Sequence, residues 1–65
     1  MATTENTNPI RAARQRARLT QLGLAQAAGV HYATIQQGEA GRRLSAATLE
    51  KIAGALGLRA EELAR

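Results

Sequence analysis

Side chains that can hydrogen-bond to the edges of bases gather in one stretch of eighteen residues, Thr20–Gln37. Gln36 and Gln37 stand together at its end, and a glutamine amide presents the donor and acceptor that match adenine N6 and N7. The stretch divides at Gly29 into two short segments of helical pattern, and the second is polar on its outward side. This arrangement indicates a protein that reads DNA.

Positive charge is concentrated in the same half of the chain. The 65 residues carry a net charge of +4, and between Ile10 and Arg43 there are six arginines and one acid, Glu39. From Leu44 onward the charges nearly balance. A basic surface suits a polyanion, because phosphate contacts release counterions. On charge alone, a solvated basic face without a partner is the alternative.

The composition argues against several other classes of protein. The chain has no cysteine and one histidine, His31, so it offers neither disulfides nor an evident metal site. No carboxylate pair occupies a recognisable cleft, so we expect neither an enzyme nor a cofactor. No stretch approaches the length of a membrane helix or signal peptide. We therefore expect a cytoplasmic protein, associated with the nucleoid when it is bound to DNA.

The elements that would position these side chains are short helices. We expect a flexible arm over residues 1–8 and one domain over residues 9–65, with Asn8 as a helix cap and Pro9 at the first helical position. Helices are predicted over residues 9–17, 21–28, 32 to 37 or 39, 46–56 and, as a short last helix, 60–64. No strand is predicted.

Three of these helices begin with the same local pattern. A large apolar residue precedes a candidate cap, and a second apolar residue follows five positions after the first, which is the hydrophobic staple arrangement. The three sets are Leu19, Thr20 and Leu24; Val30, His31 and Ile35; and Leu44, Ser45 and Leu49. Because a staple fixes the angle at which the chain enters a helix, these sets predict defined helix crossings.

Several spaced motifs resemble one family of bacterial and phage transcriptional regulators. They are LTQ at 19–21, LA at 24–25, GV at 29–30, TI at 34–35, EAG at 39–41 and SAATLEKIAGALG at 45–57. The chain is similar over residues 10–63 to Cro/C1-type (Xre) helix-turn-helix domains. This resemblance implies an all-α bundle of five short helices with the lambda-repressor-like fold. It also implies that the third helix lies in the major groove, usually in a dimer on a two-fold symmetric operator.

The resemblance also implies roles for individual residues. The base-facing positions of the third helix match Tyr32, Ala33, Gln36 and Gln37. The positions that contact the DNA backbone match or lie near Gln21, His31, Thr34, Arg42 and Arg43. For Thr34 a local backbone hydrogen bond is an equal alternative, and His31 either touches phosphate, more favourably when protonated, or is only a mediocre cap. Glutamine, alanine and tyrosine together favour A·T pairs.

Two further sets of residues have structural roles in the family. Arg14 and Glu39 align with an ion pair between the first helix and the end of the third. Leu56, Leu58 and Leu63 match the region of the dimer contact, although apolar residues there can equally complete the core of the monomer.

The sequence departs from the family pattern at positions that affect packing. Gly38 stands where a large apolar residue faces the core, and Ala13 stands where leucine is common. These small residues predict either a thin contact between the first and third helices or an altered end of the third helix that brings the chains closer. Leu44 replaces a common proline before the cap of the fourth helix.

Two functions are consistent with these features of the sequence. The first is a small transcriptional regulator, most often a repressor, that binds double-stranded DNA as a homodimer on a palindromic operator. The alternative is a protein-interaction module of the same fold, such as an antitoxin or accessory factor, with DNA binding secondary. An exposed Leu22 and the apolar carboxy-terminal end would serve a protein partner.

Overall fold

Five helices follow one another in the predicted order. A computed structural model describes residues 8–64, and these form α1 (Pro9–Arg16), α2 (Gln21–Ala28), α3 (Tyr32–Glu39), α4 (Ala46–Leu56) and α5 (Ala60–Leu63). The described residues contain no strand, so the predicted all-α fold is confirmed. Of the predicted arm, residues 1–7 lie outside the described residues, and Asn8 caps α1.

Polar side chains begin three of the helices as the sequence predicts. In each case the oxygen of the cap accepts a hydrogen bond from a backbone N–H of the first turn, which otherwise has no partner. Asn8 accepts from Arg11 N at 2.9 Å, Thr20 from Gly23 N at 2.9 Å and Ser45 from Thr48 N at 3.1 Å. The starts of α1, α2 and α4 are therefore fixed by the local sequence.

The starts of α3 and α5 have no such cap. His31 and Arg59 occupy the cap positions without a side-chain hydrogen bond to the helix. At α5 the carboxylate of Glu62 instead accepts from the backbone N–H of Arg59 at 3.1 Å, which fixes the start from the other direction. At α3 the apolar staple residues Val30 and Ile35 pack in or against the core at the start of the helix.

Two glycines allow the chain to leave a helix and turn sharply. Gly29 after α2 and Gly57 after α4 have φ angles of 73° and 72°, in the left-handed region that favours glycine. Leu58 N then donates to Ala53 O at 2.9 Å, and Val30 N donates to Ala25 O at 3.0 Å. The turn at Gly29 leads from α2 to α3, and the turn at Gly57 leads from α4 toward α5.

The core lies between all five helices. α2 packs against α3 and α4, α4 packs against α5, and α1 packs against α3 and α5. Three side chains are completely buried, Leu24, Ile35 and Ile52, each 0% exposed. The rest of the buried core consists of Ile10, Ala13, Ala25, Ala53 and Leu63. Each helix thus contributes at least one buried side chain.

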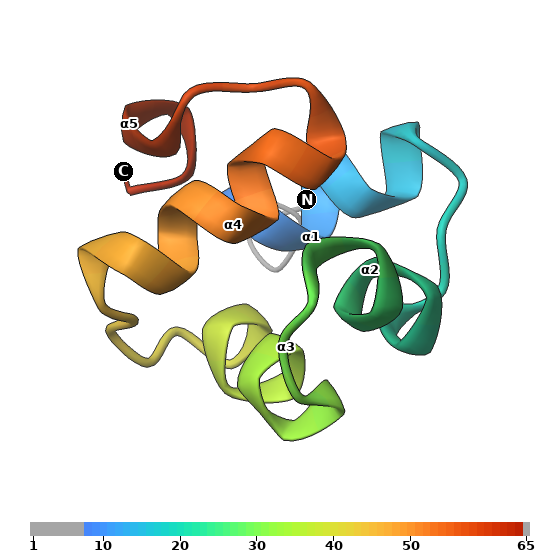
Figure 1. Cartoon of the computed structure of the whole chain (residues 1–65), viewed down its shortest axis with the longest axis horizontal. Helices are drawn as coiled ribbons and strands as arrows, with labels where there is room; N and C mark the ends of the chain where they lie inside the picture. Colours follow the sequence, from blue (N-terminus) through green and yellow to red (C-terminus); the bar gives the residue numbers. More distant parts are fainter. Residues whose placement is uncertain (1–7, 65) are drawn as a thin grey trace, which may run out of the picture.

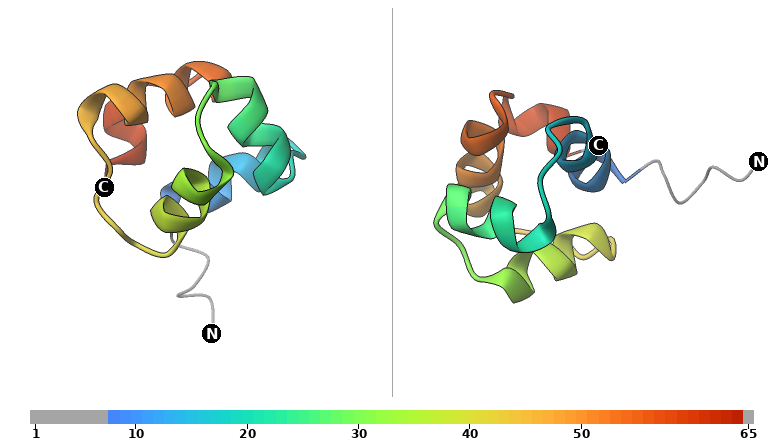
Figure 2. Two further views of the ribbon diagram at one scale, coloured as in Figure 1. Left: turned by 60° about the horizontal axis from the view of Figure 1, so that its bottom comes forward. Right: turned by 90° about the vertical axis from the view of Figure 1, so that its right-hand side faces the viewer.

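Packing places α3 at the edge of the molecule. In Figure 1, α4 runs across the middle, with α3 below it and α5 at the upper left. In the right-hand view of Figure 2, α3 again lies along the lower edge, next to α2. The face of α3 that points away from the core is therefore open to a partner.

Gly38 brings α1, α3 and the following loop close together. A Cβ atom at this position would lie 2.8 Å from Leu44 Cδ1 and 2.9 Å from Ile10 Cδ1, closer than real Cβ contacts come. The Asn8 amide also donates to the backbone oxygen of Gly38 at 3.0 Å. The predicted thin contact is therefore not seen at this position, because Leu44 and Ile10 fill the space that a larger side chain would occupy.

Candidate nucleic-acid interface

The outward face of α3 is a row of exposed side chains. Tyr32, Ala33, Gln36 and Gln37 are all exposed, whereas Ile35 and Gly38 are buried on the other side of the helix. Since residues three and four apart share one face of a helix, the four predicted base-facing residues form one surface. Its chemistry is two amides, one phenol and one methyl group.

Two further predicted residues stand at the start of α3. His31 is exposed and makes no capping bond with its side chain. Thr34 is half-buried, and its backbone N–H donates to the backbone oxygen of His31 at 3.0 Å. His31 is thus the more accessible of the two to a ligand that approaches α3.

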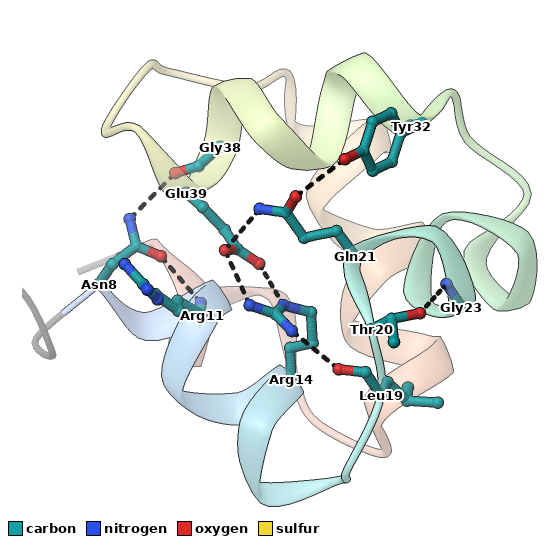
Figure 3. Close-up of polar contacts among 10 residues, drawn as sticks. All are labelled: Asn8, Arg11, Arg14, Leu19, Thr20, Gln21, Gly23, Tyr32, Gly38 and Glu39. Atoms are coloured by element: carbon teal, nitrogen blue, oxygen red, sulfur yellow. Dashed lines mark hydrogen bonds and ion pairs between the residues drawn. The ribbon is translucent and has the colours of Figure 1, made fainter.

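An ion pair joins α1 to the end of α3. Arg14 Nε donates to Glu39 Oε2 at 2.5 Å, and a second guanidinium nitrogen donates to Glu39 Oε1 at 3.2 Å. The remaining terminal nitrogen of Arg14 donates to Leu19 O at 2.8 Å (Figure 3). The side chains are 12% and 6% exposed, so a charged pair is held largely out of water with its hydrogen bonds made.

The polar contacts continue from Glu39 to the outer face of α3. Gln21, the first residue of α2, donates from Nε2 to Glu39 Oε1 at 3.0 Å. Tyr32 Oη donates to Gln21 Oε1 at 3.3 Å, as Figure 3 shows. The predicted backbone contact Gln21 is therefore bonded to both ends of α3, and we call Arg14, Glu39, Gln21 and Tyr32 the polar chain.

An open groove runs beside the polar chain. It is lined by residues of α1, the start of α2 and the outer side of α3, and its walls include Arg11, Leu22 and Gln36. Arg11 was not assigned a binding role from the sequence, whereas an exposed Leu22 was predicted to serve a protein partner. Arg11 precedes Arg14 by three positions on α1, and this spacing would have placed both on the side that faces α3.

The loop after α3 carries the other predicted cations. Arg42 and Arg43 are exposed, and among the described residues neither takes part in an ion pair. The backbone N–H of Arg42 donates to Gln37 O at 3.0 Å, and this bond ties the start of the loop to the last turn of α3. Both guanidinium groups are available to an anion that contacts α3.

The three candidate dimer residues differ in exposure. Leu63 is 5% exposed and belongs to the core, so the structure assigns this residue to the monomer core, the second of the two alternatives. Leu56 and Leu58 are half-buried and pack against the same core. These two retain some surface for a second chain.

Among residues 8–64, no three His, Cys, Asp or Glu side chains come together as metal ligands would. None of the helices in this part of the chain is both long and apolar enough to cross a membrane.

Comparison with known proteins relates the chain to a family. A family model described as Helix-turn-helix matches residues 10–63. This range begins at the buried Ile10 and ends at the buried Leu63, so it covers the whole five-helix core. No curated protein and no solved structure shows a significant match to the chain.

Proposed function

The chain belongs to the Cro/C1-type (Xre) helix-turn-helix family, which makes it a DNA-binding regulator, and we propose that it represses transcription as a dimer on a palindromic operator. In this proposal α3 enters the major groove and two copies occupy the two halves of the site. Bound copies would keep the polymerase from the DNA that contains the operator. In this proposal the protein is cytoplasmic and is associated with the nucleoid when it is bound to DNA.

The observation that carries the proposal is the distribution of charged side chains around α3, where the negative charge is inside the fold and the positive charges are exposed. Glu39 is the only acid between Ile10 and Arg43, and its carboxylate faces Arg14 inside the fold. The exposed face of α3 therefore carries no negative charge, while Arg11, Arg42 and Arg43 are exposed near it. This distribution suits a polyanion that lies along α3.

We assign base contacts to the exposed amides of α3. Gln36 and Gln37 can each make paired hydrogen bonds to adenine N6 and N7, and Ala33 can pack against a thymine methyl group. Contacts of this kind distinguish one base pair from another, so these residues would determine which operator is bound.

Backbone contacts are assigned to the flanking groups. Arg11 lies on α1 in the groove beside α3, and Arg42 and Arg43 lie in the loop after α3. His31 and Thr34 stand at the start of α3. The first turn of α2, where Gln21 lies, adds helix N–H groups that can face phosphate. Phosphate contacts fix the register of α3 but carry no direct sequence information.

Titration of the protein into duplexes chosen from a random pool, at two salt concentrations, tests the proposal. We expect affinity to fall steeply with salt, because each phosphate contact releases counterions. Gln37→Ala should change the preferred sequence, whereas Arg43→Ala should weaken all sequences alike and reduce the salt slope by about 1. Lys51→Ala, which removes an exposed charge from α4, should leave the slope unchanged. If neither Gln37→Ala nor Arg43→Ala has any effect, the assignment of α3 to the groove is wrong.

A second function is favoured by one exposed apolar pair. Leu22 and Tyr32 are 53% and 44% exposed and line the same groove, which would suit a protein partner. This alternative predicts that selection from the random pool of duplexes yields no preferred sequence, and that the protein binds every duplex weakly.

A further inference from the structure

We propose that Tyr32 reads an exocyclic amino group of a base, because its hydroxyl group faces DNA as a hydrogen-bond acceptor. The inference rests on the proposed placement of α3 in the major groove. It adds a specificity determinant whose hydrogen-bonding direction is set by residues that do not touch the base.

The direction originates at Glu39. An ionised carboxylate can only accept hydrogen bonds, and Glu39 accepts from two nitrogens of Arg14. Whatever side chain approaches the remaining side of this carboxylate must therefore donate. Gln21 does so with Nε2, at 3.0 Å from Glu39 Oε1.

This contact fixes the orientation of the Gln21 amide. A glutamine amide has its nitrogen and oxygen on opposite sides, so turning Nε2 toward Glu39 turns Oε1 toward Tyr32. Both ends of the amide are engaged at once, at 3.0 Å and 3.3 Å. Rotation of the amide by half a turn would place an oxygen against the carboxylate and lose the bond to Glu39, so this contact holds the amide in the orientation that offers Oε1 to Tyr32.

The hydroxyl group of Tyr32 is consequently committed as a donor. Its partner, Gln21 Oε1, is an acceptor, so the single phenolic hydrogen lies between the two oxygens. The lone pairs of Tyr32 Oη remain for an external ligand, and the side chain is 44% exposed. Toward DNA, Tyr32 is therefore an acceptor as long as the polar chain is intact.

Few groups in the major groove can donate to such an acceptor. Adenine N6 and cytosine N4 are the donors there, whereas N7, guanine O6 and thymine O4 are acceptors, as are phosphate oxygens. An intact polar chain thus directs Tyr32 to an amino group, and it disfavours a phosphate contact by this hydroxyl. Packing of the ring against a thymine methyl group is compatible with the same placement.

Base analogues that lack one amino group test this inference. Starting from a duplex selected by the wild-type protein, adenine is replaced by purine, or cytosine by pyrimidin-2-one, at one position of the half-site at a time. At one position we expect the analogue to lower the affinity of the wild-type protein for the duplex about three- to tenfold, which is the range for the loss of one hydrogen bond. Tyr32→Phe should bind that analogue and its parent duplex equally.

A second variant tests whether the polar chain sets the direction. Gln21→Met keeps the length of the side chain but removes its donor and its acceptor, so the hydroxyl hydrogen of Tyr32 becomes free to rotate. The freed hydroxyl group can donate as well as accept, so the comparison here is between the parent duplex and one in which guanine replaces adenine, or thymine replaces cytosine, and puts an oxygen at that position. We expect Gln21→Met to lose most of the discrimination between these two duplexes, while Gln26→Met, on an exposed part of α2, keeps it. A purely structural effect would instead lower affinity for both duplexes by the same factor.

The outcomes separate this inference from the proposed function. If the wild-type protein and Tyr32→Phe show the same parent-to-analogue ratio at every position, Tyr32 reads no amino group and the inference is overturned. If Gln21→Met discriminates as well as the wild type, the polar chain does not set the direction. If the wild-type protein selects no duplex at all, the proposed function fails, and this inference fails with it.

Discussion

Glu39 is the residue on which the most polar contacts converge. It accepts from Arg14 and from Gln21, so it joins α3 to α1 and to the first turn of α2. Removing one partner leaves the other charge largely buried without compensation. We expect Glu39→Ala to lower the free energy of unfolding by about 3 kcal/mol, measured by urea denaturation.

Glu50→Ala is the matched control, because Glu50 is exposed on α4. Its free energy of unfolding should stay within about 0.5 kcal/mol of the wild type. Equal effects of the two substitutions would mean that the pair between Arg14 and Glu39 contributes no more than a surface charge does.

At the residue scale, the sequence predicted which residues belong to the site, but it predicted few of the hydrogen bonds between them. The family resemblance identified Arg14 and Glu39 as partners, and the helical period identified the exposed row of α3. The bonds of Gln21 to Glu39 and Tyr32 were not foreseen, because they depend on how α2 crosses α3. The bond from Asn8 to Gly38 O spans 30 positions of sequence, and no local pattern encodes it.

At the scale of elements, Gly38 determines how closely α3 approaches α1 and the loop before α4. Gly38→Ala would gain about 1 kcal/mol in helix propensity. Its Cβ, however, would meet Leu44 Cδ1 at 2.8 Å and Ile10 Cδ1 at 2.9 Å. Since overpacking costs about 1 to 3 kcal/mol, we expect a net destabilisation of about 1 kcal/mol, measured by urea denaturation.

Two comparisons make this prediction specific. In the background of Leu44→Ala the overlap with Leu44 is gone and that with Ile10 remains, so Gly38→Ala should become about neutral, and the double-mutant cycle should show a coupling of about 1 kcal/mol. Gly54→Ala, within α4 where no atom lies within 4 Å of the added Cβ, should stabilise the wild type by about 0.5 to 1 kcal/mol. Additive effects of Gly38→Ala and Leu44→Ala would contradict the close contact.

Helix boundaries were the most predictable feature of the elements. Caps and terminal glycines are local signals, and α2 and α4 begin and end where the sequence predicts. α1 ends at Arg16, one residue earlier than predicted, followed by Arg18 with a φ of 61°. The packing at Gly38 could not be chosen from sequence, because a missing side chain can leave a gap or be filled by a neighbour, and here Leu44 and Ile10 fill it.

At the scale of the whole molecule, the five helices close one core within a single chain. Leu63 of α5 packs with Ile10 and Ala13 of α1 in this core, so the carboxy-terminal helix is part of the monomer. The sequence left this role of Leu63 open, because an apolar residue in a terminal helix looks the same whether it faces its own core or a second chain. Only the path of the chain after Gly57 decides between them.

Leu63→Ala therefore distinguishes a core residue from a dimer contact. Truncation of a buried leucine costs about 2 to 5 kcal/mol, and we expect a loss near the lower end because α5 is short. Thermal melts over a hundredfold range of chain concentration should show the same loss at every concentration. If Leu63 acted mainly between two chains, its effect would shrink as dilution separates them. Adding a selected duplex should raise the midpoint of both proteins, because DNA binds the folded chain. The difference between them should persist, because Leu63 is buried in the core and is not part of the exposed face of α3 that we assign to DNA.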